Sequence, residues 1–103
     1  MRSRYSAFFL SLPKYIIKTT HKDNVDYTQD ITQWENDIVY FTQNFNFEKL
    51  TIIDHIPGNT ISFVTFKAQI SSHGKDETFC EKSKFERINN RWLYLSGEQI
   101  IKA

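Results

Sequence analysis

The pattern of apolar and polar residues changes near Phe47, and this change divides the chain into a helical half and a strand half. Before Phe47, apolar residues recur three and four positions apart, and after it they alternate with polar ones. Helices followed by an antiparallel meander predict an α+β fold with the helices on one face of a curved sheet. Since the chain has only 103 residues, we expect a single domain over positions 1–103.

Two short helices and one longer helix are predicted in the first half. The first helix, from Arg2, should carry an apolar stripe with helical spacing: Tyr5, Phe8, Phe9 and Leu12. Pro13 would interrupt its hydrogen-bond ladder and open a second helix that ends near His21. Asp30 is the predicted N-cap of the third helix, which should end near Asn44.

Four antiparallel strands are predicted in the second half, at about residues 50–56, 64–70, 77–87 and 91–96. Turn-forming residues separate them: Pro57-Gly58-Asn59, Ser72-His73-Gly74 and Asn89-Asn90. We therefore expect a four-stranded antiparallel sheet.

The third predicted strand suggests a site. Because side chains alternate along a strand, four of them should share the face toward the helices: Phe79, Glu81, Ser83 and Phe85. A carboxylate and a hydroxyl between two phenylalanines on a half-buried face predict the wall of a pocket. Cys80 should point to the opposite face.

Two interpretations of Glu81 are open. Desolvation disfavours its charged form, so it could transfer protons near neutral pH. Alternatively, it pairs with a cation, either Arg2, Arg4 or Arg87, and we expect a bond to a group on the first helix. The arginines Arg2 and Arg4 could likewise hold an anionic ligand or fix the first helix to the last strands.

Three further residues have both a functional and a structural interpretation. His21 could titrate in a pocket, or it could cap a helix end. Ser83 is expected to be a hydrogen-bond partner rather than a nucleophile, since no base or oxyanion loop is evident. Trp92, close to Tyr94, is expected in a core or an interface.

Composition narrows the class of protein. Thirteen basic and twelve acidic residues are interleaved, which predicts no nucleic-acid partner. One cysteine and three dispersed histidines offer no metal-ligand spacing, so we expect no metal, no cofactor and a cytoplasmic location. No segment approaches the ~20 apolar residues of a membrane span. Ile61 and Phe63 on the outer sheet face, near several lysines, predict a monomer or a weak homodimer.

Several motifs in order along the chain resemble one family: MRSRYSAF at 1–8, Thr20-His21, Phe66-Lys67-Ala68, EKSKF at 81–85 and RWLY at 91–94. They are similar to the YchJ-like family of bacterial proteins. The resemblance implies a nuclear-transport-factor-two-like, or cystatin-like, cone of helices around a curved sheet. The cysteine-rich, zinc-binding SEC-C segments usual in that family are not found in these 103 residues, so zinc binding is not carried over. Cys80 stands where the family motif commonly has His.

Two functions follow as hypotheses. The first is a non-catalytic module that binds a small ligand or a protein partner in the open end of the cone. Its pocket would involve seven residues: Arg4, Tyr5, His21, Glu81, Ser83, Phe85 and Trp92. The alternative is an isomerase- or hydrolase-like enzyme in which Glu81 and His21 exchange protons. The sequence assigns no catalytic residue.

Overall fold

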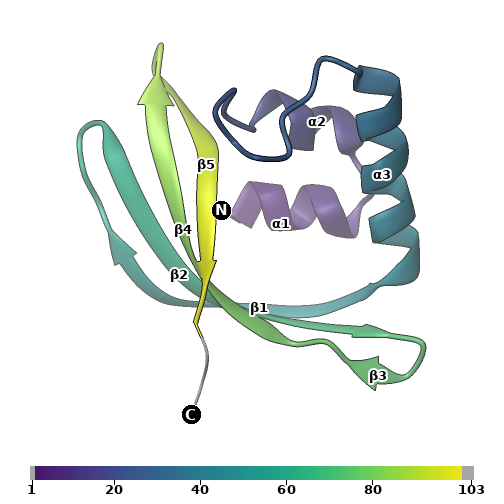
Figure 1. The fold of residues 1–103 in the computed structure, drawn as a ribbon. Helices are drawn as coiled ribbons and strands as arrows, with labels where there is room; N and C mark the ends of the chain where they lie inside the picture. The colour runs from purple at the N-terminus through teal and green to yellow at the C-terminus, as the bar shows by residue number, and fades with distance from the viewer. Residues whose placement is uncertain (1, 101–103) are drawn as a thin grey trace.

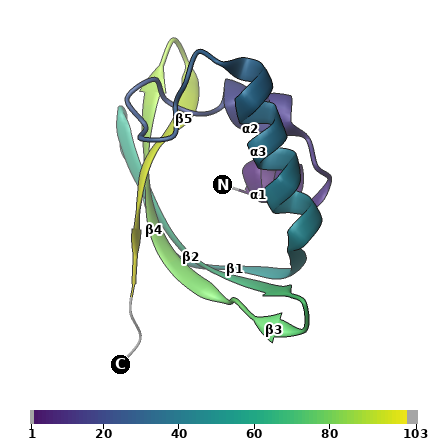
Figure 2. The same ribbon diagram turned by 45° about the vertical axis from the view of Figure 1, so that its right-hand side comes forward.

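Three helices lie on the concave side of one strongly curved antiparallel sheet (Figures 1 and 2). The structure is a computed structural model and describes residues 2–100. The helices are α1 (Arg2–Phe9), α2 (Pro13–Lys18) and α3 (Ile31–Asn44). The strands are β1 (Asn46–Ile56), β2 (Ile61–Ser72), β3 (Lys75–Asp76), β4 (Phe79–Ile88) and β5 (Arg91–Gln99). The predicted α+β class is confirmed.

The sheet has the order β1-β2-β4-β5, and β3 adds a short pairing at the end of β2. All neighbouring strands are antiparallel. The four predicted strands are confirmed, although β1 begins earlier than expected, at Asn46, and the two-residue β3 was missed. Register shifts interrupt the β1–β2 ladder twice and the β4–β5 ladder once. Because such bulges bend strands, they help to produce the concave face.

Local signals set the starts of α2 and α3 as predicted, whereas α2 ends at Lys18, before the expected end near His21. Pro13 occupies the first position of α2, where its missing N–H is not needed. The Asp30 side chain accepts a hydrogen bond from the backbone N–H of Gln33 at 3.1 Å and caps α3. Trp34 and Ile38 of α3 are buried against the other helices.

The predicted apolar stripe of α1 is right for Tyr5 and Phe8, which pack against the core, and wrong for Phe9 and Leu12, which are 61% and 47% exposed. The helix ends at Phe9, and Ser11 adopts a left-handed backbone with φ of 54°. The inward face also carries Arg4 and Ala7, and Ala7 packs against the other helices. The turn before Pro13 ends the helix, so the spacing of apolar residues beyond Phe9 does not place them on a helical face.

The apolar core consists of two clusters with a space between them. Ala7, Ile16, Trp34 and Ile38 form the helix cluster. Phe66, Ala68 and Ile70 of β2 form the sheet cluster, against which Tyr5 and several aromatic side chains pack. No helix within residues 2–100 is long and apolar enough to cross a bilayer.

The assignment of the core face of α3 can be tested by a matched pair of substitutions. Ile38→Ala should lower the free energy of unfolding by about 2–5 kcal/mol, because it empties a buried site in the helix cluster. Ile31→Ala in the same helix should cost clearly less, since Ile31 is 44% exposed. Urea denaturation followed by circular dichroism would measure both. Equal losses would contradict this core assignment.

Candidate functional site

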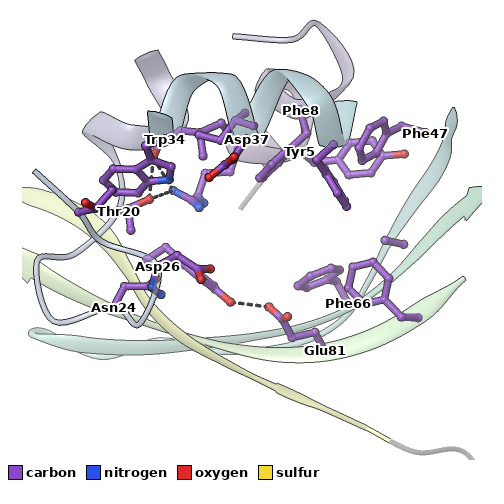
Figure 3. Close-up of a pocket in the computed structure, with 18 residues that line it drawn as sticks. Tyr5, Phe8, Thr20, Asn24, Asp26, Trp34, Asp37, Phe47, Phe66 and Glu81 are labelled. Atoms are coloured by element: carbon purple, nitrogen blue, oxygen red, sulfur yellow. Dashed lines mark hydrogen bonds between the residues drawn. The ribbon is translucent and has the colours of Figure 1, made fainter. Parts of the chain in front are cut away.

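A cavity of about 510 Å³ lies between the helices and the concave face of the sheet (Figure 3). Its wall is rich in aromatic side chains, among them Tyr5, Phe8, Trp34, Phe66, Phe79 and Tyr94. Its polar lining includes Arg4, Thr20, Asn24 and three carboxylates, those of Asp26, Asp37 and Glu81. The cavity therefore combines an apolar wall with a few charged groups.

Strand β4 places Glu81 in this wall by its alternation. Glu81 lies opposite Phe66 of β2, and Phe79 lies opposite Ala68, so both face the cavity as predicted. The Oε2 atom of Glu81 accepts hydrogen bonds from the Ser83 hydroxyl at 2.6 Å and from the Tyr94 hydroxyl at 3.0 Å. Glu81 is thus held by its own sheet.

The expected bond between Glu81 and the first helix is wrong for Arg4 and the rest of the described part of α1. No ion pair or hydrogen bond joins Glu81 to those residues, and the side chain of Arg2 lies outside the described part of the structure. The hydroxyls of Ser83 and Tyr94, which lie on the sheet beside Glu81, are its hydrogen-bond partners instead of a group on the helix. The sequence interpretation missed the role of Tyr94, which was expected in a core or an interface.

Tyr94 remains a hydrogen-bond donor to Glu81 over a wide pH range. Burial raises the pKa of the Tyr94 phenol, and the neighbouring Glu81 carboxylate raises this pKa further. Both effects disfavour the phenolate. The Tyr94 to Glu81 bond is therefore a fixed element of the cavity wall at neutral pH.

Gly97 leaves the space that this hydrogen bond occupies. A Cβ atom at Gly97 would collide with the Glu81 carboxyl group and with the Tyr94 hydroxyl. Gly97 pairs with Ser83 across the β4–β5 ladder, directly beside both groups. Its role was missed from the sequence, where the only signal is a glycine inside an otherwise bulky strand.

Arg4 fixes α1 to the rest of the fold, as one of the two interpretations predicted. Its Nη1 atom donates to the Ile16 carbonyl at 3.2 Å, to the Thr19 hydroxyl at 2.7 Å and to the Thr20 hydroxyl at 3.3 Å. The guanidinium carbon lies 4.7 Å from the Tyr94 ring centroid. Burial lowers the pKa of Arg4 to about 10, so this side chain is still a cation at neutral pH.

His21 lines neither this cavity nor the second one described below. Its buried imidazole accepts the Asp23 backbone N–H at Nδ1, 2.9 Å away, so the proton is at Nε2, 2.6 Å from Glu86. Glu86 alternates with Phe85 and faces away from the cavity. The structure therefore does not bring His21 and Glu81 together.

The other predicted pocket residues are divided between two places. Phe85 and Trp92 line a second, more open cavity of about 940 Å³. Ser83 is fully buried and lines neither cavity. The single pocket expected from the sequence is thus two cavities, and Arg4 lines both.

Tyr5 joins the wall of the first cavity to β1. Its ring packs edge-on against Phe47, with centroids 5.8 Å apart. Burial, and secondly the charge of Glu48, raise the pKa of the Tyr5 phenol. Its buried hydroxyl has no hydrogen-bond partner within residues 2–100.

Two exposed carboxylates at the cavity, Asp26 and Asp37, were not found from the sequence. Asp26 lies in the loop after α2, which is held against β5 because the Asn24 amide donates to the Leu95 carbonyl at 2.8 Å. Asp37 is on α3, on the other side of the opening (Figure 3). The polar composition of this loop gives no sign that it borders a cavity.

Comparison with known proteins identifies the family. Residues 1–97 match the family described as YchJ, middle NTF2-like domain. The chain belongs to the YchJ family. Its NTF2-like fold agrees with the helices packed on a curved sheet, so the cone expected from the sequence motifs is confirmed.

Relatives in this family share much of the chain. A UPF0225 protein of Serratia proteamaculans is 34% identical over 101 residues, which cover 94% of this chain and 62% of that protein's length. The crystal structure of a SEC-C motif containing protein from Psychrobacter arcticus is 30% identical, with a TM-score of 0.74, covering 100% of this chain and 60% of that one. The solution structure of a SEC-C motif containing protein from Rhodopseudomonas palustris has a TM-score of 0.84 at 24% identity, covering 98% and 76%. At 24% identity, the similarity to the Rhodopseudomonas palustris protein shows a shared fold and nothing more.

No group of three or more histidine, cysteine or acidic side chains within the described residues is placed to hold a metal ion. That this chain binds no zinc remains a prediction, and elemental analysis of the purified protein would test it.

The bond between Ser83 and Glu81 should contribute measurably to stability. Ser83→Ala should lower the free energy of unfolding by about 1–3 kcal/mol, because it removes a buried donor to a carboxylate. Ser96→Ala is the matched control, since Ser96 is exposed on the neighbouring strand. Denaturant titrations of both variants would test this assignment, and a neutral Ser83→Ala change would refute it.

The raised pKa of Tyr94 predicts a loss of stability at alkaline pH. Below the ordinary phenol pKa of 10, Tyr94 is protonated in both the folded and the unfolded state. Above about pH 10 the unfolded chain ionises first, so stability falls as pH rises toward the folded-state pKa. Tyr94→Phe should therefore flatten the fall of Tm between about pH 10 and 11.5, whereas Tyr40→Phe, at an exposed site, should not. Identical slopes for wild type and Tyr94→Phe would contradict the effect.

Proposed function

We propose that the first cavity binds a small, largely apolar ligand and that the domain is a non-catalytic binding module. The observation that carries this proposal is an aromatic cavity with a few polar groups held in place. A volume of about 510 Å³ is in the usual range for small-molecule sites. Such sites combine apolar walls with a small number of orienting polar groups.

The polar groups of the cavity are preorganised. Tyr94 and Ser83 hold the Glu81 carboxylate, and the end of α2 holds the Arg4 guanidinium. Fixed groups bind ligands better because little conformational freedom is lost on binding. This supports a binding role for the cavity.

The alternative enzyme hypothesis depends on proton exchange between Glu81 and His21. His21 is engaged at both ring nitrogens and lines neither cavity. No observed feature therefore favours that mechanism over simple binding. The molecule-sized volume of the cavity also favours a small ligand over a protein partner.

The outer sheet face supports the proposal of a monomer or weak homodimer. Phe63 is only half-buried there, and the Lys82 ammonium lies 5.0 Å from its ring centroid. A second copy that bound tightly to this face would have to desolvate the lysine over the ring, and this disfavours a tight dimer. A cytoplasmic location remains a prediction from the single cysteine.

Indole is a suitable neutral probe of the cavity. We expect it to shift the amide resonances of cavity-lining residues in a saturable way, measured in ¹⁵N–¹H spectra. Ala68→Met should weaken this binding about tenfold or more, because Ala68 is a buried part of the wall and the larger side chain fills the space.

Thr65→Met is the matched control, because Thr65 lies on the opposite face of β2. It should leave the indole affinity unchanged. Absence of saturable shifts in the wild type, or equal binding by Ala68→Met, would refute the proposed function.

A further inference from the structure

Arg4 and Glu81 bring opposite charges to the same cavity without forming an ion pair. Both side chains line the first cavity. Among the ion pairs of the described residues, all of which have N–O distances within 4.0 Å, none joins Arg4 to Glu81. Opposite charges that are largely removed from water are normally in contact, since each is costly when unpaired. Tyr94 contacts both side chains, and the cavity that Arg4 and Glu81 line leaves a place for a ligand beside them.

Arg4 has unused donors at this place. It is only 9% exposed, and its three hydrogen bonds all come from Nη1. Within residues 2–100, no hydrogen bond from its Nε or Nη2 atoms is found. Guanidinium groups accept carboxylates through two parallel hydrogen bonds. A carboxylate that enters the cavity would satisfy these donors.

Glu81 offers the complementary acceptor. Its two hydrogen bonds both end at Oε2, and in the described part of the chain Oε1 has no hydrogen-bond partner. An ammonium group is the natural donor to such an oxygen. At the opening, the exposed carboxylates of Asp26 and Asp37 also favour a positive group over a second negative one.

The surrounding wall suits an aromatic or large aliphatic side chain. Phe66 lies directly opposite Glu81 on the neighbouring strand, and Phe79 packs edge-on against Phe66 with centroids 5.9 Å apart. An apolar group placed there would be removed from water at the same time as the two ligand charges are paired.

We propose that the ligand is a small zwitterion of the α-amino-acid type with a large apolar side chain, an inference that rests on the proposed binding function. Its carboxylate binds Arg4, its ammonium group binds Glu81, and its side chain packs against the phenylalanine wall. A ligand with one charge would leave either Arg4 or Glu81 without a partner of opposite charge. Only a ligand with both charges satisfies the two side chains together.

L-Phenylalanine tests this inference when compared with two analogues that each lack one charge. N-acetyl-L-phenylalanine lacks the cation, and L-phenylalanine methyl ester lacks the anion. Isothermal titration calorimetry at neutral pH should give L-phenylalanine an affinity about tenfold or more above that of either analogue. An analogue that binds as tightly as L-phenylalanine would overturn the zwitterion assignment.

Glu81→Gln provides the second arm of the test. The glutamine oxygen can still accept from Ser83 and Tyr94, but the negative charge is lost. This variant should lose about tenfold in affinity for L-phenylalanine, and the preference for L-phenylalanine over N-acetyl-L-phenylalanine should disappear with it. Glu98→Gln, at an exposed position of β5, is the control and should change neither affinity.

The two arms separate failure of this inference from failure of the binding function. If indole binds in the cavity but L-phenylalanine gains nothing over its analogues, the zwitterion assignment is wrong and the binding site stands. If neither indole nor L-phenylalanine binds, the proposed function itself fails.

Discussion

The buried cation of Arg4 is the constraint on which the packing of the helices over the sheet depends. Removing a guanidinium from water costs several kcal/mol unless its surroundings compensate for the lost hydration. The compensation comes from three separate elements, since α1 carries Arg4, the end of α2 supplies acceptors such as the Thr19 hydroxyl, and β5 supplies the Tyr94 ring. The cation is satisfied only when all three elements are docked. The first helix and the last strand are therefore coupled through one side chain.

Backbone hydrogen bonds reinforce the same junction. The Tyr94 N–H donates to the Thr19 carbonyl and the His21 N–H donates to the Tyr94 carbonyl, each at 2.8 Å. The segment after α2 thus covers the edge of β5, which would otherwise present unpaired backbone groups. His21 then reaches past β5 to Glu86. The hydrogen bonds of its imidazole hold this edge of the sheet together, so His21 has a structural role.

The features that were predictable from the sequence depend on local signals. The alternation in β4 placed Glu81 and Phe79 on one face, Pro13 marked the start of α2, and Asp30 marked the start of α3. Each of these conclusions needs only neighbouring residues and the geometry of one helix or strand.

The features that were missed depend on contacts between distant residues. The spacing of α1 could not reveal that small Ala7, rather than Phe9, lies at the contact between helices. In the same way, His21 and its partner Glu86 are 65 positions apart, and nothing near either residue identifies the other. A hydrophobic pattern predicts which face is buried but not which polar groups meet there. The partners of a site therefore require the three-dimensional structure.

The fold leaves unfilled space beside two charged side chains, Arg4 and Glu81, that are costly to remove from water. Bulges curve the sheet around the helices, and Ala68 is a small residue where a larger one would fill the space. Gly97 is needed only because Glu81 and Tyr94 meet above it. A domain optimised for stability alone would bring Arg4 and Glu81 into contact or replace both with apolar side chains. Two separate, fixed charges in one cavity instead suit a ligand that carries both complementary charges.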